Sequence, residues 1–427
     1  MPQPTAPAPP AARAVYPAYV VGLFSMGMMD VFVILVPLYA ISLGLSATQI
    51  GILIGVRSVL TMMFAIHAGT LMDRFGTRRV MLFIAGITVV LAPIYPLVPW
   101  FPALVLLQIL CGGTASLTWL GAQTLIAHIG HGEALYIGRF TFSARIGTSA
   151  APIVAGAIWD LGGAWVAFLF AMAWAGVLFV TILIVSEPHL LAKPEPPSAA
   201  PDAAPDASPD ASPDAAPETP FRLRDALPRL TDYVQSFAML AIPAVALTVA
   251  VVFVRNSTSG IQNSIYIVYM DEIGLTGTLI GILFAAVEIT SGLGALLSGR
   301  LMRMADPKWI IVIGATLAIA LIAATPLFAG VFALLMLAQL VRGVLQGVIQ
   351  PIMFSMQAKS VRRDQQGAVV GLRQTMNRVA AIIVPPLMGI IADMTSVADS
   401  FLILGAIMLA ACGLLALGAH RVPKFEG

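Results

Sequence analysis

The sequence predicts an all-helical membrane protein with twelve transmembrane helices in two pseudo-symmetric repeats of six. Three observations predict this fold class. Of 427 residues, 59% are hydrophobic and only 10% are charged, which lies outside the range of soluble globular domains. Apolar runs long enough to cross a bilayer occur twelve times, six on each side of a polar segment. Residues of the first set also recur in the second at near-constant displacements.

A hydrocarbon core about 30 Å thick requires roughly 20 apolar residues of helix. Runs of this kind are expected at 16–42, 48–72, 79–98, 102–128, 138–160 and 164–186, and then at 238–270, 277–302, 308–328, 330–358, 367–393 and 398–419. They divide the chain into a tail (1–15), a six-helix bundle (16–186), a linker (187–237), a second bundle (238–419) and a tail (420–427). Cys111 and Cys412 fall inside apolar runs and are expected to be core residues.

The charged residues outside the spans orient the helices. Eighteen of the 23 Lys and Arg residues lie in the tails, the linker and every second connection between helices. The remaining connections carry only acids, at Asp160, Asp271, Glu272, Asp393 and Asp399. By the positive-inside rule, both termini and the linker are expected to be cytoplasmic, in a multi-pass protein of the cytoplasmic (inner) membrane.

The linker contains a four-residue repeat, PDAA, PDAS, PDAS and PDAA, from Pro201 to Ala216. Proline at every fourth position blocks a helix, so a spacer is predicted, and a docking segment for a partner is the alternative. After the repeat, apolar residues from Phe221 to Val234 recur at near-helical spacing among arginines. They indicate an amphipathic helix on the inner leaflet, or else an unstructured basic lead-in to the seventh span.

The two bundles are predicted to be repeats of one ancestor. The fifth span has Gly138, Arg145, Pro152, Gly156 and Asp160, and the eleventh has Gly371, Arg378, Pro385, Gly389 and Asp393, each displaced by 233 residues. Around the second span, Leu45, Thr48 and Gly51 recur as Leu275, Thr278 and Gly281, displaced by 230.

The connection between the second and third spans is short and rich in charge. Its residues include Gly69, Asp73, Arg74, Gly76 and Arg78. This pattern resembles the signature of the major facilitator superfamily at the same place, with Thr77 where the family more often has a basic residue. The resemblance implies two six-helix halves that work as a secondary transporter by alternating access.

The resemblance also implies a conformational latch formed by these loop residues. Asp73 is expected to sit against the cytoplasmic start of the eleventh helix, near Arg373, where a carboxylate meets the positive end of a helix dipole. In the family this contact holds the halves together when the cavity opens outward. The alternative is that Asp73 is only a solvated residue of the loop, without a latch role.

The fifth span carries a second resemblance, formed by Gly147, Ala151-Pro152 and Ala155-Gly156. It resembles the antiporter signature of drug–proton exporters, Gly-x-x-x-Gly-Pro-x-x-Gly-Gly, with alanine at two glycine positions. Small residues allow close helix approach and proline allows a bend. The arginine that such exporters carry on the fourth helix is absent, and Gln108 stands near its place.

Seven charged residues lie within the spans: Asp30, Arg57, Arg145, Arg255, Glu288, Arg342 and Arg378. A charge at the bilayer centre costs a few kcal/mol or more, so these side chains are expected to face the bundle interior or a water-filled cavity. They occupy the helices that surround the central cavity in the family.

Roles follow from depth and charge. Asp30 and Glu288 are the acids deep enough to carry protons, and Arg57, Arg255, Arg342, Gln346 and Gln350 are candidate substrate-binding residues. Arg145, Arg378 and Pro385 join the fifth-span residues as candidates for helix packing or gating. In the alternative interpretation, Arg57 only neutralises Asp30. The excess of buried arginine favours an anionic or amphipathic substrate over a lipophilic cation.

We therefore expect proton-coupled efflux of a small organic molecule, with proton-coupled uptake of an organic anion as the first alternative. A non-transporting membrane sensor or assembly factor is the second. The sequence has no P-loop for ATP and no nucleophile constellation, so no enzyme activity, cofactor or metal is expected. The expected partners are the substrate, protons and the lipid bilayer, without nucleic acid, and a monomer is expected.

Overall fold

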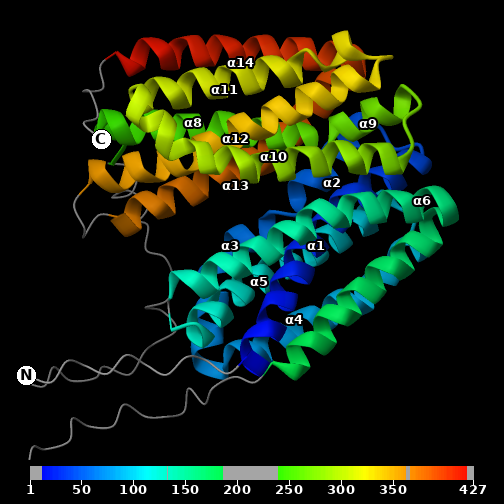
Figure 1. Ribbon diagram of the computed structural model, residues 1–427. Helices are drawn as coiled ribbons and strands as arrows, with labels where there is room; N and C mark the ends of the chain where they lie inside the picture. Colours follow the sequence, from blue (N-terminus) through cyan, green and yellow to red (C-terminus); the bar gives the residue numbers. More distant parts are fainter. Residues whose placement is uncertain (1–11, 132, 186–238, 362–365, 421–427) are drawn as a thin grey trace, which may run out of the picture.

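The computed structural model describes residues 12–131, 133–185, 239–361 and 366–420, whose regular elements are all helical. The N-terminal half contains α1 (Ala12–Ser42), α2 (Ala47–Val56), α3 (Val59–Phe75), α4 (Thr77–Leu91), the 3-10 helix η1 (Ala92–Leu97), α5 (Phe101–Ile129) and α6 (Ala134–Ile184). The C-terminal half contains η3 (Met239–Ala241), α8 (Pro243–Gln262), α9 (Ile265–Glu272), α10 (Gly277–Met304), α11 (Pro307–Ala323), η4 (Thr325–Phe328), α12 (Phe332–Ser360), α13 (Gln366–Met394) and α14 (Val397–Ala419). In Figure 1 the C-terminal half lies above the N-terminal half.

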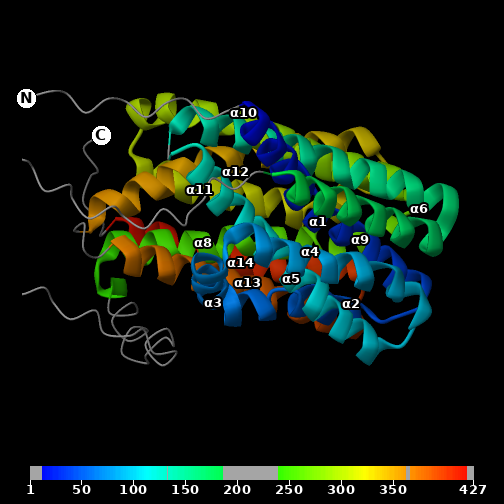
Figure 2. The ribbon, with the colours of Figure 1, turned by 90° about the horizontal axis from the view of Figure 1, so that it is seen from below.

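Within the described residues the helices form twelve spans, so the predicted fold class is confirmed. Ten helical segments are long and apolar enough to cross a membrane, and α11 is a shorter apolar helix. The long α6 accounts for two spans, because Gly163 has φ 63° and ψ −164° and reverses the chain between them. Glycine suits this turn, since side chains with a Cβ disfavour positive φ. Figure 2 shows the helices running lengthwise between the same two ends of the molecule.

Two of the expected continuous spans are interrupted. The second span breaks at Arg57 and Ser58 into α2 and α3, and the seventh breaks at Asn263 and Ser264 into α8 and α9. At the first break, Gly112 of α5 lies against the backbone of Arg57, where a Cβ on Gly112 would collide.

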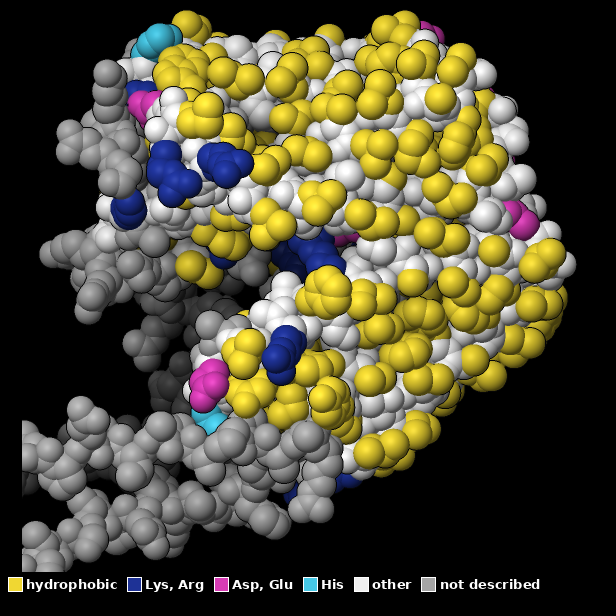
Figure 3. Space-filling model, viewed as in Figure 1, with side chains coloured by type: hydrophobic (Ala, Val, Ile, Leu, Met, Phe, Trp, Pro, Cys, Tyr) yellow, Lys and Arg dark blue, Asp and Glu magenta, His cyan; other side chains and the backbone are white. Residues whose placement is uncertain are grey.

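The two ends of the bundle differ in charge, and we name them by it. The basic face carries Arg78, Arg79, Arg139, Arg300, Arg303 and Lys308, and the acidic face carries Asp160, Asp271, Glu272, Asp393 and Asp399. In Figure 3 most of the basic side chains lie to the left, and acidic ones mark the right-hand end. The sidedness of these faces in the membrane stays a prediction.

The halves meet along two equivalent contacts near the acidic face. The first half of α6 packs on α10, and α13 packs on α2. A Cβ added at Gly281 would collide with the backbone carbonyl of Pro152, and one added at Gly51 would collide with that of Pro385. Because these pairs are related by the sequence repeat, the internal repeat appears in space as a pseudo-twofold pair of interfaces.

A carboxylate closes each interface at the acidic face. Asp160 accepts hydrogen bonds from the backbone nitrogens of Gly277 (2.7 Å) and Thr278 (2.8 Å). Asp393 accepts equivalent bonds from Ala47 (2.9 Å) and Thr48 (2.9 Å). Each acid therefore caps the first turn of a helix in the opposite half, where the unpaired N–H groups and the helix dipole favour a negative charge.

The linker and its possible amphipathic helix over 221–234 lie outside the described residues, as do 1–11 and 421–427. The predicted domain boundaries there stay predictions.

Candidate functional site

The halves enclose a central cavity of about 260 Å³. Its polar lining includes Arg57, Ser58, Asn256, Asn263, Asn377 and Arg378. The lining runs from Pro385, at the closed interface, to Gln374 on the part of α13 nearer the basic face. Figure 3 shows the molecule hollowed between the halves on the same side as the basic face. The cavity is therefore open toward the basic face and sealed toward the acidic face.

One ion pair joins the halves beside this cavity. Arg145 of α6 donates from Nη1 to Oε2 of Glu288 on α10 at 2.5 Å. Their side chains are 39% and 35% exposed, so the pair is only partly buried between the halves. Arg145 stands seven residues from Pro152 toward the basic face, which places the pair at the inner limit of the sealed contact.

Asp30 lies close to this pair on α1. It is half-buried, within electrostatic range of Glu288, Arg57 and Arg145, and makes no ion pair with a described residue. Its Oδ2 and the Nη1 of Arg57 are buried without a hydrogen-bond partner among the described side chains and backbone. The two acids predicted to carry protons thus share one cluster with two of the predicted arginines.

Other predicted binding residues lie between α8 and α12. Arg255 donates to the amide oxygen of Gln350 at 3.1 Å, and Gln346 donates to the hydroxyl of Thr258 at 3.4 Å. Arg255 is within electrostatic range of Glu288 and Arg145, whereas Gln346 is buried. Arg255 and Gln350 therefore adjoin the charged cluster, with Gln346 behind them.

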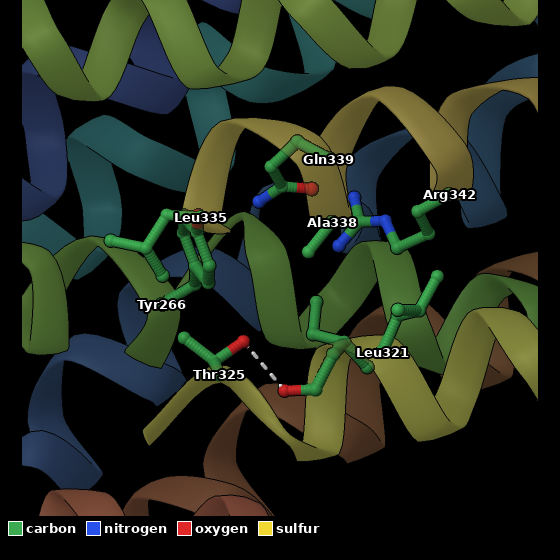
Figure 4. A pocket seen from close by; sticks show the side chains of 8 residues that line it. Tyr266, Leu321, Thr325, Leu335, Ala338, Gln339 and Arg342 are labelled. Carbon is green, nitrogen blue, oxygen red and sulfur yellow. Dashed lines mark hydrogen bonds between the residues drawn. The ribbon is translucent and has the colours of Figure 1, made fainter. Parts of the chain in front are cut away.

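Arg342 has a different environment from the other arginines. It is 1% exposed and donates to the amide oxygen of Gln262. Figure 4 shows its guanidinium beside Gln339, in a small cavity that is also lined by Tyr266 and Thr325. That cavity measures about 10 Å³, enough for a water molecule but not for an organic compound. Although the sequence predicts that Arg342 faces the substrate, in this conformation it lies outside the central cavity.

The predicted latch is only partly visible. Side chains of Gly69, Asp73 and Arg74 lie outside the described part of the structure. Gly76 has φ 88° and forms the turn between α3 and α4, a conformation that favours glycine.

Two of the three basic residues named with the latch, Arg78 and Arg373, contact their own halves. Arg78 donates to the carbonyls of Ile182 (3.1 Å) and Leu183 (2.5 Å) at the end of α6. Arg373 stacks on Phe354, with its guanidinium carbon 4.0 Å from the ring centroid.

The residues of the antiporter-like segment pack at helix crossings. A Cβ at Gly147 would collide with the carbonyl of Leu23 on α1, and one at Gly156 with that of Gly277 on α10. Gln108, near the place of the missing arginine, is fully buried and accepts a hydrogen bond from the hydroxyl of Tyr95 at 2.7 Å. That position therefore contributes to packing within the N-terminal half.

Sequence reasoning missed five polar residues of the cavity: Ser58, Ser116, Asn256, Ser259 and Asn263. Asn256 hydrogen-bonds to Asn377 across α8 and α13. An available signal was the position of Asn256 next to Arg255 and of Ser58 next to Arg57, within otherwise apolar spans. In the described part of the chain, no group of three or more His, Cys, Asp or Glu residues is placed to hold a metal ion.

A helical membrane protein whose two related halves enclose a polar, charged cavity at mid-depth belongs to the class of membrane transport proteins. Comparison with known proteins defines the family. The family model described as Major Facilitator Superfamily matches residues 18–254 and 247–426, and the chain therefore belongs to that superfamily.

Individual relatives are distant but match nearly the whole chain. The enterobactin exporter EntS of Salmonella paratyphi A is 24% identical over 426 residues, covering 96% of this chain and 93% of that protein. EntS of Escherichia coli O81 is 26% identical over 422 residues, covering 94% and 91%. A solved structure of a mutant of the nucleoside transporter NupG has a TM-score of 0.72 at 14% identity, covering 96% of this chain and 100% of that one. The last likeness supports the fold alone.

Proposed function

We propose that the protein exports a small organic molecule, anionic or amphipathic, across the cytoplasmic membrane in exchange for protons by alternating access. The observation that carries the proposal is the cavity itself. It lies between the halves, opens at the basic face and is sealed at the acidic face. Under the predicted orientation, the open face is cytoplasmic, which is where an exporter loads its substrate.

Asp30 and Glu288 are the proposed proton-coupling residues. Glu288 forms the ion pair that joins the halves, and Asp30 lies within electrostatic range of it. Protonation of Glu288 would remove the charge that holds Arg145, so it changes the relative free energies of the conformations with this interface closed and open. Proton binding and opening toward the acidic face are thereby linked.

Substrate contacts are proposed for Arg57 in the cavity and for Arg255 and Gln350 beside it. Arg342 and Gln346, which are buried residues of α12, are proposed to hold this helix in position. Export is favoured over uptake because the relatives matched over nearly the full chain are described as exporters.

The test is transport by the purified protein in proteoliposomes with an imposed pH gradient. The panel contains enterobactin, aromatic carboxylates and their neutral amides. We expect proton movement that depends on an anionic or amphipathic member of the panel, and its loss in Asp30→Asn and Glu288→Gln. Substrate movement without proton movement would contradict proton coupling. No movement of any member, with correctly folded protein, would favour the non-transporting alternative.

A further inference from the structure

The two interfaces between the halves are equivalent near the acidic face. They differ farther from that face, at the level of Arg145 and Arg378. On both sides a glycine packs against a proline carbonyl, Gly281 with Pro152 and Gly51 with Pro385. A carboxylate then caps the helix that carries the glycine. The repeat therefore predicts that Arg378 has the same neighbour as Arg145.

The expected neighbour is missing. Glu288, which pairs with Arg145, is displaced by 230 residues from Ser58, as Gly281 is from Gly51. Serine is too short and carries no charge. Arg378 has neither an ion pair nor a hydrogen bond with any described residue. One interface thus ends in an arginine–carboxylate pair, and the other ends in an arginine that faces a cavity.

The cavity at this position is electropositive. Arg378 and Arg57 both line it, on opposite halves, and each lies within electrostatic range of the other. Among the residues that the structure describes, no acidic residue lines this cavity, and Asp30 is an acid whose charge acts on Arg57. Two neighbouring cations in a low-dielectric site repel each other, so an anion placed between them is stabilised by both.

We propose that the cavity holds an anion subsite in which a carboxylate of the ligand takes the place of the missing side chain at position 58. The ligand carboxylate accepts hydrogen bonds from Arg378 on one side and Arg57 on the other. Arginine suits this role because its planar guanidinium binds a carboxylate through two parallel hydrogen bonds. The amide side chains of Asn256, Asn377 and Gln374 line the same cavity and supply further hydrogen-bond groups.

This subsite deepens the proposed function, on which it rests, by assigning the substrate a carboxylate or a similar planar oxyanion. It also explains why only one interface has its own acid. The Arg145–Glu288 pair is complete without ligand, whereas the Arg378 interface is complete only when an anion is bound. Bound substrate would thereby contribute to the contact between α13 and the break at Arg57 and Ser58.

The test is to put the missing carboxylate back. Ser58→Glu places it opposite Arg378, and Ser58→Gln adds the same bulk without the charge. Binding of benzoate and of neutral benzamide is measured by calorimetry on the full-length protein in nanodiscs. We expect benzoate to bind Ser58→Glu about tenfold or more weaker than Ser58→Gln, because the built-in carboxylate occupies the arginines. Benzamide should distinguish the two variants far less.

Two further variants keep the inference testable if Ser58→Glu fails to fold. Arg378→Gln should remove the preference for benzoate over benzamide, and Arg378→Lys should keep only part of it, since lysine cannot bind bidentately. Equal benzoate affinity in Ser58→Glu and Ser58→Gln, or an unchanged preference in Arg378→Gln, would overturn the subsite. Because binding is measured without a gradient, failure here is separate from failure of proton-coupled export, which the proteoliposome assay reports.

Discussion

At the scale of residues, the arginines within the spans have three different environments. Arg145 is neutralised by Glu288 at 2.5 Å. Arg255 and Arg342 donate to amide oxygens, of Gln350 and Gln262. Arg57 and Arg378 line the central cavity. A simple count of buried charges overstates the positive potential at Arg145, because Glu288 neutralises it. It understates the positive potential at the central cavity, whose lining includes no acid among the described residues.

The pair between Arg145 and Glu288 can be tested by charge exchange. Arg145→Glu and Glu288→Arg each replace the ion pair with two neighbouring like charges, so each should abolish coupled transport. The double variant restores an ion pair and should recover part of the activity. Both native side chains are more than a third exposed, so we expect the free energy of unfolding to change by only about 0–1 kcal/mol.

Proteoliposome transport and thermal unfolding measure the two effects separately. A double variant as inactive as either single one would show that the identity of each residue matters beyond the pair. A large loss of stability would indicate that the pair is structural and has no separate coupling role.

The sequence predicted the cluster of charges but not its pairing. Asp30, Arg57 and Glu288 lie within apolar runs, and a charge that faces lipid is costly in free energy. These two facts were enough to predict that the three side chains face the bundle interior. Which arginine meets which acid depends on the rotation of each helix about its axis. It also depends on which interface is closed, and a single sequence contains neither quantity. Pairing between Arg145 and Glu288 was therefore not predicted, and Arg342 was expected to face the cavity.

At the scale of elements, two carboxylate caps hold the acidic face closed. Each cap joins the end of one helix to the start of another in the opposite half, Asp160 to α10 and Asp393 to α2. A conformation open at this face must separate these elements and break both caps. Under the proposed alternating access, the caps would therefore contribute to the equilibrium between the two conformations as well as to folding.

We expect Asp160→Asn combined with Asp393→Asn to shift the equilibrium toward opening of the acidic face. A charge at a helix N-terminus contributes about 0.3–1 kcal/mol, so losing two should change the population ratio by about threefold to thirtyfold. Spin labels at Leu161 and Met394, both highly exposed near this face on opposite halves, report the separation. Asp399→Asn is the matched control, because Asp399 bonds with Ser396 of its own half. An unchanged distance distribution in the double variant would exclude this role.

The repeat made the equivalence of the two interfaces predictable from sequence, because Pro152, Gly156 and Asp160 recur at a constant displacement. The break between α2 and α3 was not predictable in the same way. Arg57 and Ser58 lie within a long, mostly apolar segment, and at the interruption the backbone of Arg57 packs against Gly112 of a different helix. Local propensity does not contain such tertiary contacts.

At the scale of the whole molecule, the structure matches one of the two conformations that the proposed alternating access would require. The acidic face is sealed by close backbone contacts, and the cavity opens toward the basic face. The opposite conformation must close the basic face, and this is the step at which the resemblance assigns a latch to Asp73. In the conformation described, Arg373 stacks on Phe354 of α12, within its own half.

The connection between α10 and α11 offers a natural comparison for Asp73. It occupies the corresponding place in the C-terminal half and contains Asp306. Asp306 accepts a hydrogen bond from the backbone nitrogen of Lys308 (3.2 Å) and pairs with its side chain at 3.6 Å. Asp306 therefore has a local capping role, whereas the latch requires Asp73 to act across the halves.

We expect Asp73→Asn to lower transport turnover by about threefold to tenfold while expression and folding stay normal, since one charge–dipole contact is lost in one conformation only. Asp306→Asn should instead lower thermal stability slightly and leave turnover within about twofold, because its contacts are present in both conformations. Labels at Leu135 and Met304, exposed near the basic face on opposite halves, should show a larger share of the open distance in Asp73→Asn. Equal turnover in Asp73→Asn and the native protein, with an unchanged label distance, would remove the latch from the mechanism. The basic face would then close through contacts between the halves that do not involve this loop.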